Sequence, residues 1–124
     1  MKDLIELTEQ LLQSIATGDW HTYEQLCDPT LTAFEPEACG HLVEGMKFHR
    51  FYFLPGRAAT DSQTTVIQPH VRMLGGDVGV VSYHRLVQSL DGNGNPISTC
   101  WEETRIWQLQ DGQWKHVHFH RSRA

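Results

Sequence analysis

The sequence predicts a single α+β domain, with helices in the first half of the chain and a curved antiparallel sheet in the second. Residues 2–17 carry apolar side chains at helical spacing. From residue 64 onward the apolar side chains alternate along strands that are separated by turn residues. A length of 124 residues corresponds to one domain, residues 1–124, with a core between the helices and one face of the sheet.

The first two helices are predicted at residues 2–17 and 20–26. Gly18 is placed to end the first helix and Asp19 to cap the second, which the Asp-Pro pair at residues 28–29 terminates. An apolar stripe on the first helix is expected to face the core and contains Leu4, Leu7, Leu11 and Ile15.

Less regular structure is expected between these helices and the sheet. Residues 31–34 and 41–43 are predicted as edge strands or irregular segments, because Pro36 and Gly40 interrupt the chain there. A third helix is predicted at residues 46–53, ended by a Pro-Gly pair and followed by a loop that leads to the sheet.

Four strands are predicted for the sheet, at residues 64–74, 78–90, 98–109 and 114–121. The turns between them contain the Gly, Asp and Asn residues that hairpins require. Residues 78–90 are apolar on both faces, which indicates either a central strand or an interface with another copy of the chain. This surface favours a homo-oligomer.

The alternation of side chains places three arginines on a face that is otherwise apolar. Arg85, Arg105 and Arg121 come from three strands, and each shares its face with Val, Trp or Phe side chains. Tyr83 and Glu103 lie on the same face. We expect the three guanidinium groups to converge on one cavity, where cations in a low dielectric require anionic partners.

Two interpretations of this arginine cluster stay open. In the first, it is a structural network in which Glu103 neutralises Arg105, and other acids such as Glu35 or Glu37 neutralise the remaining charges. In the second, the cavity accepts a carboxylate from a small ligand or a peptide segment, because the planar guanidinium group matches a carboxylate. An arginine-rich cavity suits anion binding better than proton abstraction, so no catalytic residue is predicted.

Histidines give no clear sign of metal binding or catalysis. Strict alternation places His116, His118 and His120 together on the opposite face of the last strand, towards solvent or a neighbouring subunit. A His-x-His pattern on a strand can bind zinc, but the apolar Trp114 shares this face, so no metal is predicted. No Ser-His-Asp or Cys-His arrangement gives His49 the role of a general base.

Composition excludes several partners. A net charge of -5 disfavours nucleic acid, no apolar run reaches membrane-spanning length, and the first residues lack the apolar segment of a signal peptide.

The three cysteines, Cys27, Cys39 and Cys100, lack the spacing of metal ligands. We expect them to be buried or half-buried thiols in a reduced, cytoplasmic location. The Gly-Asn-Gly at residues 92–94 is a hairpin turn without the helix of a phosphate loop, so no cofactor is predicted.

Many segments, in order along nearly the whole chain, resemble the association (hub) domain of calcium/calmodulin-dependent protein kinase II. They include T-E-Q-L-L, T-A-F-E-P-E-A, L-V-E-G-M-K-F-H-R-F-Y-F, Y-H-R-L-V-Q, E-E-T-R-I-W and W-K-H-V-H-F-H-R. The resemblance implies a cone-shaped fold of the nuclear-transport-factor-2-like (cystatin-like) type. It also implies a non-catalytic assembly role, in which hub domains form two stacked rings of twelve, fourteen or more subunits that carry calmodulin-regulated serine/threonine kinase domains.

The family also has a deep arginine-lined pocket, thought to receive small carboxylates or an acidic segment. Its arginines match Arg85 in Y-H-R, Arg105 in E-E-T-R and Arg121 in H-F-H-R, and its histidine matches His49 in F-H-R-F-Y-F. One departure is the loop L-P-G-R-A-A-T-D-S-Q, which lacks the tryptophan that flanks the pocket in family members with a longer loop.

Alternatives to a kinase-borne hub remain. The same cone fold hosts isomerases and dehydratases, so a small-molecule enzyme is the competing class. The chain would otherwise be an excised domain, or a free-standing regulator that joins mixed rings with kinase-borne hub domains. Trp101 and His84 lie on strands that are expected to make ring contacts, where they would alter ring size.

Overall fold

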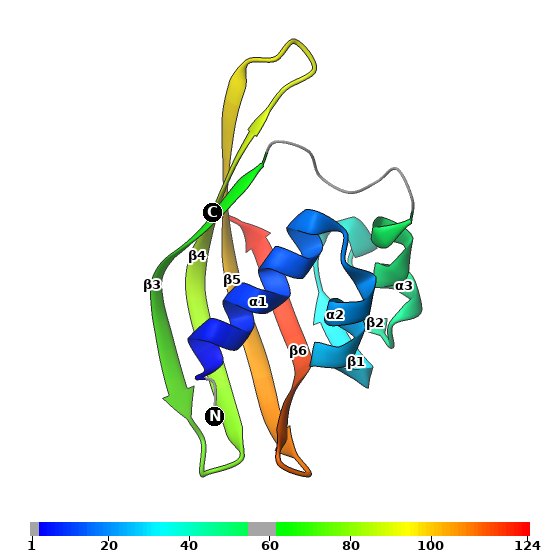
Figure 1. Cartoon of the computed structure of the whole chain (residues 1–124), viewed down its shortest axis with the longest axis vertical. Helices are drawn as coiled ribbons and strands as arrows, with labels where there is room; N and C mark the ends of the chain where they lie inside the picture. Colours follow the sequence, from blue (N-terminus) through cyan, green and yellow to red (C-terminus); the bar gives the residue numbers. More distant parts are fainter. Residues whose placement is uncertain (1–2, 55–61) are drawn as a thin grey trace.

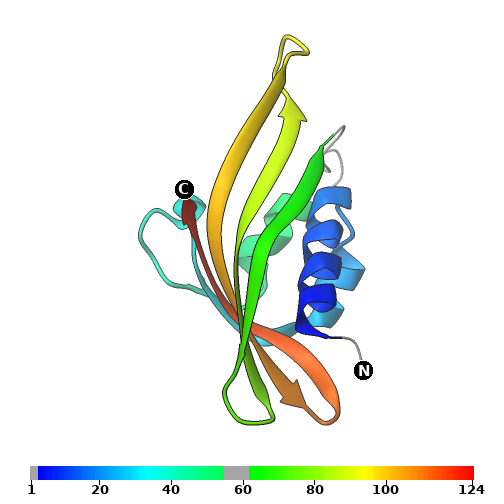
Figure 2. The same ribbon diagram turned by 90° about the vertical axis from the view of Figure 1, so that its left-hand side faces the viewer.

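Helices α1 and α2 lie against one face of a six-stranded sheet (Figure 1). The structure is a computed structural model that describes residues 3–54 and 62–124. The strand order is β2-β1-β6-β5-β4-β3, and every neighbouring pair is antiparallel except β1 and β6. The sheet bends around the helices (Figure 2), so the predicted α+β class with an N-terminal helix against a curved sheet is confirmed.

The helices and strands follow one another in the predicted order. The helices are α1 (Leu4–Thr17), α2 (Trp20–Leu26) and α3 (Lys47–Arg50), with the short 3-10 helices η1 (Pro36–Ala38) and η2 (Phe51–Phe53). The strands are β1 (Cys27–Phe34), β2 (Val43–Glu44), β3 (Gln63–Met73), β4 (Val78–Leu90), β5 (Pro96–Gln110) and β6 (Gln113–Arg123).

Local capping defines the ends of the first two helices. The carboxylate of Asp3 accepts a hydrogen bond from the backbone N–H of Glu6 at 2.9 Å, and Gly18 ends α1 with a φ of 71°. The carboxylate of Asp19 accepts from the backbone N–H of Thr22 at 3.1 Å and so begins α2. The predicted roles of Gly18 and Asp19 are confirmed.

The core lies between α1 and the inner face of the sheet. The indole N–H of Trp107, which is fully buried on β5, donates a hydrogen bond to the hydroxyl of Thr8 at 3.1 Å. The apolar stripe of α1 is buried against the strands through Leu4, Leu7, Leu11 and Leu12. Burial of each such leucine contributes about 1.5–3 kcal/mol relative to exposure, which holds α1 across the sheet.

The first strand corrects the prediction of an edge strand at residues 31–34. β1 begins at Cys27, directly after α2, and lies inside the sheet between β2 and β6. It runs parallel to β6, where Thr32 pairs with His118, 86 positions away. The prediction was wrong because local periodicity carries no information about a strand partner so distant in the chain.

A β-bulge on β6 corrects the prediction that three histidines share the outer face. Trp107 on β5 pairs with His116, but the adjacent Ile106 pairs with His118, so Val117 is the extra residue. One extra residue reverses the alternation of side chains. His116 is therefore fully buried on the inner face, whereas His118 and His120 remain outside.

The remaining predictions had mixed outcomes. Cys27 is buried as expected, but Cys39 and Cys100 are exposed, so the prediction was wrong for those two thiols. The Pro-Gly pair at residues 55–56 and most of the loop that lacks the family tryptophan lie outside the described residues. None of the described helices is long and apolar enough to cross a membrane.

Candidate functional site

The three arginines lie on neighbouring strands, Arg85 on β4, Arg105 on β5 and Arg121 on β6, and they line one cavity of about 180 Å³. We call this space the arginine cavity. Its other walls come from α1, α2, η1, α3, η2 and β6, and they include Ile15, Tyr23, Glu35, Glu37, His49, Tyr52, Phe53 and Phe119. Aromatic rings and guanidinium groups thus enclose the same small volume.

Arg105 is held by internal hydrogen bonds. Its Nε donates to the Tyr83 hydroxyl at 2.8 Å, and its Nη2 donates to Oε1 of Glu103 at 3.1 Å. The Tyr83 hydroxyl in turn donates to the same carboxylate oxygen at 2.6 Å. The Arg105 guanidinium also lies 4.4 Å from the ring centroid of Phe119. Because Arg105 is only 1% exposed, it forms the fixed floor of the cavity.

Glu103 is the anion that all three arginines share. Its Oε2 lies 2.9 Å from Nε of Arg85 and 3.6 Å from Nε of Arg121, in addition to the contact with Arg105. Burial opposes ionisation of Glu103, but the charges of Arg105 and Arg85 outweigh it and hold the pKa of this carboxyl below its ordinary value. Glu103 therefore remains ionised in the interior and keeps three cations close together.

Two further carboxylates reach the cavity from outside the sheet. Nη1 of Arg121 donates to Oε1 of Glu37 at 2.5 Å and lies 3.8 Å from Oε1 of Glu35. Oε2 of Glu35 is also 2.5 Å from Nε2 of His49 on α3. The other ring nitrogen of His49, Nδ1, is buried and has no hydrogen-bond partner among the described residues.

The carboxylates around the cavity differ in exposure. The side chain of Glu103 is completely buried and that of Glu35 is 5% exposed, whereas that of Glu37 is 36% exposed. Burial opposes the ionisation of Glu37, yet the hydrogen bond from Arg121 lowers the pKa of its carboxyl below the usual value. Glu37 thus lies at the rim of the arginine cavity, where its ionised carboxylate accepts the hydrogen bond of Arg121.

The structure separates the predicted site residues into two groups. Arg85, Arg105, Arg121 and His49 line the cavity, whereas Tyr83 and Glu103 lie beneath it and hold the arginines in place. The internal acids that the network interpretation requires are present, and a cavity is present beside them.

One residue beside the site escaped prediction. The fully buried His116 lies with Nε2 3.5 Å from Nη1 of Arg105 and Nδ1 3.5 Å from Sγ of Cys27. Burial, with the charge of Arg105 as a second cause, lowers the pKa of His116 well below its ordinary value, so the ring is neutral near pH 7. Only the bulge on β6 brings this histidine inside, and no local pattern in the sequence marks that bulge.

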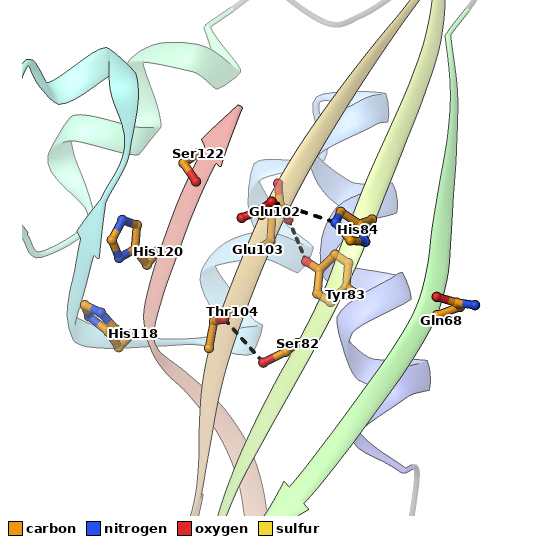
Figure 3. A pocket seen from close by; sticks show the side chains of 10 residues that line it. All are labelled: Gln68, Ser82, Tyr83, His84, Glu102, Glu103, Thr104, His118, His120 and Ser122. Atoms are coloured by element: carbon orange, nitrogen blue, oxygen red, sulfur yellow. Dashed lines mark hydrogen bonds and ion pairs between the residues drawn. The ribbon is translucent and has the colours of Figure 1, made fainter. Parts of the chain in front are cut away.

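A second hollow of about 780 Å³ lies on the outer face of the sheet (Figure 3). Its walls are polar and include Ser82, His84, Glu102, Thr104, His118 and His120. The hydroxyl oxygens of Ser82 and Thr104 lie 3.3 Å apart, and the exposed His84 and Glu102 side chains are 3.9 Å apart. No group of three His, Cys, Asp or Glu side chains in residues 3–54 and 62–124 is arranged to hold a metal ion.

Comparison with known proteins identifies the family. A family model described as the calcium/calmodulin dependent protein kinase II association domain matches residues 1–124. Calcium/calmodulin-dependent protein kinase type II subunit delta of Oryctolagus cuniculus is 49% identical over 123 residues, which is 98% of this chain and 23% of the relative. The chain therefore spans about a quarter of the length of that kinase subunit.

Solved structures agree with the sequence match. The association domain of the C. elegans kinase superposes with a TM-score of 0.93 at 43% identity, over 97% of this chain and 92% of the other. The hub homology domain from Chlamydomonas reinhardtii gives a TM-score of 0.90 at 46% identity, over 98% of this chain and 95% of the other.

A more distant likeness confirms the fold class alone. A nuclear transport factor 2-like protein from Salmonella enterica gives a TM-score of 0.77 at 19% identity, over 95% of this chain and 86% of the other. The end-to-end family match, the 49% identity to a kinase subunit and the superposition on hub structures lead to one conclusion. This chain belongs to the calcium/calmodulin-dependent protein kinase II association-domain family.

Proposed function

We propose that the chain is a non-catalytic assembly module that forms homo-oligomers built as two stacked rings. The observation that carries this proposal is the match of the whole chain to association and hub domains. A small-molecule isomerase is the competing class on this fold, but an arginine-lined cavity suits anion binding better than isomerisation.

Apolar side chains on the outside of the sheet support assembly. Val80 and Ile106 form a cross-strand pair on the face opposite α1 and remain only half-buried. The hairpin of β4 and β5 projects beyond the rest of the fold (Figure 1) and carries Leu90 and Ile97, which are 50% and 44% exposed. Adjoining apolar side chains on the outer face of a sheet, such as Val80 and Ile106, are typical of an interface between subunits.

Light scattering coupled to size-exclusion chromatography tests the assembly proposal. At micromolar concentration we expect a species of twelve or more chains. A stable monomer or dimer would overturn the proposal. Within a longer kinase chain, such rings would gather kinase domains, and a free-standing copy would join mixed rings with kinase-borne hub domains.

We also propose that the arginine cavity binds a carboxylate. Arg85 and Arg121 would receive its oxygens, Arg105 would supply a fixed positive floor, and His49 would hydrogen-bond through its unpartnered Nδ1. Tyr83 and Glu103 would orient the arginines without contacting the ligand. The ligand must compete with Glu37, which already occupies Arg121.

Calorimetric titration with butyrate, with butyramide as the uncharged control, tests this site. Butyrate should bind and should raise the unfolding temperature of the assembled protein, whereas butyramide should do neither, because it lacks the charge that pairs with the guanidinium groups. Arg121→Gln should weaken butyrate binding by about tenfold or more, while Arg72→Gln, an exposed arginine on β3, should not change it.

A second variant separates the two interpretations of the arginine cluster. Glu37→Gln removes the competing carboxylate, so it should tighten butyrate binding by roughly three- to tenfold. If the cluster is only a structural network, butyrate will not bind to the unchanged protein or to the Glu37→Gln variant, and the proposal of a ligand site is wrong.

A further inference from the structure

Four of the eight histidines in this chain lie on the outer face of the sheet. Side chains alternate along a strand, so every second residue of β3 to β6 points to the face opposite α1. We call the part of this surface that carries imidazole rings the histidine face, and its four histidines are His70, His84, His118 and His120. The last three of these line the polar hollow (Figure 3).

The histidine face is continuous with the apolar pair that we assign to assembly. Val80 pairs with Ile106, and Ile106 pairs with His118, so these side chains form one row across β4, β5 and β6. In the neighbouring row His120 pairs with Phe34 of β1, and the centroids of the two rings are 5.6 Å apart. Phe34 is itself 41% exposed. A partner that covers the apolar pair therefore also covers histidines.

The histidine face has little negative charge to neutralise protonated imidazole rings. Within the described residues, only His84 among the four lies within 4.0 Å of a carboxylate, which is that of Glu102 at 3.9 Å. His118 instead shares a hydrogen bond of 2.7 Å with the hydroxyl of Thr32. Four protonated rings would thus place four positive charges beside the single carboxylate of Glu102.

Other charged side chains lie towards the edges and ends of the same strands. They are Arg72 on β3, Lys115 on β6, Asp28 on β1 and Glu44 on β2. The ammonium of Lys115 donates a hydrogen bond to the backbone carbonyl of Gln25 at 2.6 Å. Two bases and two acids cancel, so these residues do not offset the charge of protonated histidines.

We infer that assembly depends on protonation of the histidine face, which binds a second copy of the chain only while its imidazole rings are neutral. In a contact between two copies related by a twofold axis, the same patch meets itself, so protonated rings of one copy would face those of the other. Burial would remove their water, and like charges would repel across the interface. The inference rests on the proposed homo-oligomer and adds the condition under which it forms.

The direction of the effect follows from the linkage of protonation to association. A histidine in a free subunit titrates near pH 6.5, whereas one covered by a partner stays neutral to lower pH. Assembly is therefore complete above about pH 6.5 and weakens as the pH falls below it. If two histidines per subunit stay neutral in a contact between two copies, the association constant should fall by up to about ten-thousandfold per pH unit. Burial, with His120 as a second cause, already lowers the pKa of His118 within one subunit.

Light scattering coupled to size-exclusion chromatography at pH 7.5, 6.5 and 5.5 tests the inference. The protein is at micromolar concentration and the ionic strength is held constant. We expect large assemblies at pH 7.5 and small species at pH 5.5, with recovery of the assemblies when the pH is returned to 7.5. Circular dichroism at each pH reports whether the subunits remain folded.

Two sets of substitutions locate the titrating groups. A triple variant with His84→Gln, His118→Gln and His120→Gln removes the rings that line the hollow but keeps polar side chains there, so its assemblies should persist at pH 5.5. The matched control carries His21→Gln and His41→Gln, which replace exposed histidines outside the sheet. This control should dissociate at pH 5.5 as the unchanged protein does.

A permanent charge tests the same surface at neutral pH. His120→Lys places an ammonium group on the exposed end of the histidine face, so the assemblies should become smaller at pH 7.5. His41→Lys adds the same charge outside the sheet and should leave the assemblies unchanged.

The outcomes distinguish this inference from the proposal on which it rests. If the unchanged protein is a monomer or dimer at pH 7.5, the proposed assembly itself is wrong. If the assemblies persist at pH 5.5, if the triple variant dissociates like the unchanged protein, or if His120→Lys assembles normally, the assembly stands but the histidine face does not control it. Loss of the circular dichroism signal together with dissociation would assign the change to unfolding and would also overturn the inference.

Discussion

At the scale of single residues, the interior depends on one carboxylate. Glu103 contacts Arg85, Arg105 and Arg121, and it is completely buried. The desolvation of three guanidinium groups is costly unless an anion offsets it, and Glu35 and Glu37 reach only Arg121. The arginines can remain in a core of tryptophan and phenylalanine because Glu103 lies among them.

Removal of this charge should be strongly destabilising. Glu103→Gln leaves at least Arg85 and Arg105 buried without their anion, so the free energy of unfolding in urea should fall by about 3–5 kcal/mol. Glu102→Gln is the matched control, because the adjacent side chain is 63% exposed and makes only a 3.9 Å contact with His84. That variant should change stability by less than about 0.5 kcal/mol. Equal effects of the two substitutions would contradict the central role of Glu103.

The buried His116 should make stability depend on pH. The pKa of His116 in the folded protein lies well below the usual value of about 6.5. Below pH 6.5 this histidine is therefore protonated in the unfolded chain but remains neutral in the folded protein. Stability is thus complete above about pH 6.5 and should fall by up to about 1.4 kcal/mol per pH unit below it. The pKa of His118 is also lowered, by burial and by His120, and adds in the same direction.

Thermal unfolding between pH 7 and pH 5 measures this effect. His116→Asn removes the titrating ring, so its stability should vary less with pH than that of the unchanged protein. His41→Asn, which replaces an exposed histidine, serves as the control and should retain the original pH dependence. If both variants show the same dependence of stability on pH as the unchanged protein, His116 is not the group responsible for it.

At the scale of secondary-structure elements, the docking of α1 requires a close approach to the sheet. Gly79 on β4 lies under the first turn of α1, where an added Cβ would be 2.1 Å from Cδ1 of Leu4 and 3.1 Å from the sulfur of Met73. A side chain at this position would force the Leu4 side chain out of its present place. The same helix lines the arginine cavity through Ile15, so its position affects the shape of that cavity.

Gly79→Ala should therefore displace the buried Leu4 side chain and lower the free energy of unfolding by about 1–3 kcal/mol, the usual cost of overpacking. Gly76→Ala is the matched control, because a Cβ at this turn position meets no atom within 4 Å. Urea unfolding followed by circular dichroism measures both variants. A Gly79→Ala protein as stable as Gly76→Ala would show that α1 does not need the close contact.

At the scale of the whole molecule, the two faces of the sheet have different roles. The inner face holds the core and the arginine cavity, whereas the outer face carries the polar hollow (Figure 3) and the half-buried pair of Val80 and Ile106. Strand β4 lies between β3 and β5 and has apolar side chains on both faces, but α1 covers only its inner face. The other side is the surface that we assign to assembly.

A charge on that outer surface should weaken assembly without unfolding the subunit. Ile106→Asp places a carboxylate at the centre of the outer face, so light scattering should detect smaller species than for the unchanged protein. Gln108→Asp, at an exposed position two residues further along the same strand, is the control and should assemble normally. Circular dichroism should report a folded protein in both cases. Normal assembly of Ile106→Asp would place the interface elsewhere.

The sequence by itself determined the features that depend on neighbouring residues. Gly18 and Asp19 marked the junction of the first two helices, because a glycine ends one helix and an aspartate caps the next. The cap that Asp3 provides at the start of α1 was not predicted. Alternation along β4 and β5 put Arg85 and Arg105 on the inner face, because these strands pair without a register shift over their whole length. Such signals reside in short stretches of chain and survive any tertiary arrangement.

Only the tertiary structure decided the features that join distant segments. It placed β1 parallel to β6, turned His116 into the core through a bulge, and brought Glu35 to His49 from separate elements. The physical reason is that strand partners, bulges and cavities are selected by the packing of the whole core, which no local periodicity records.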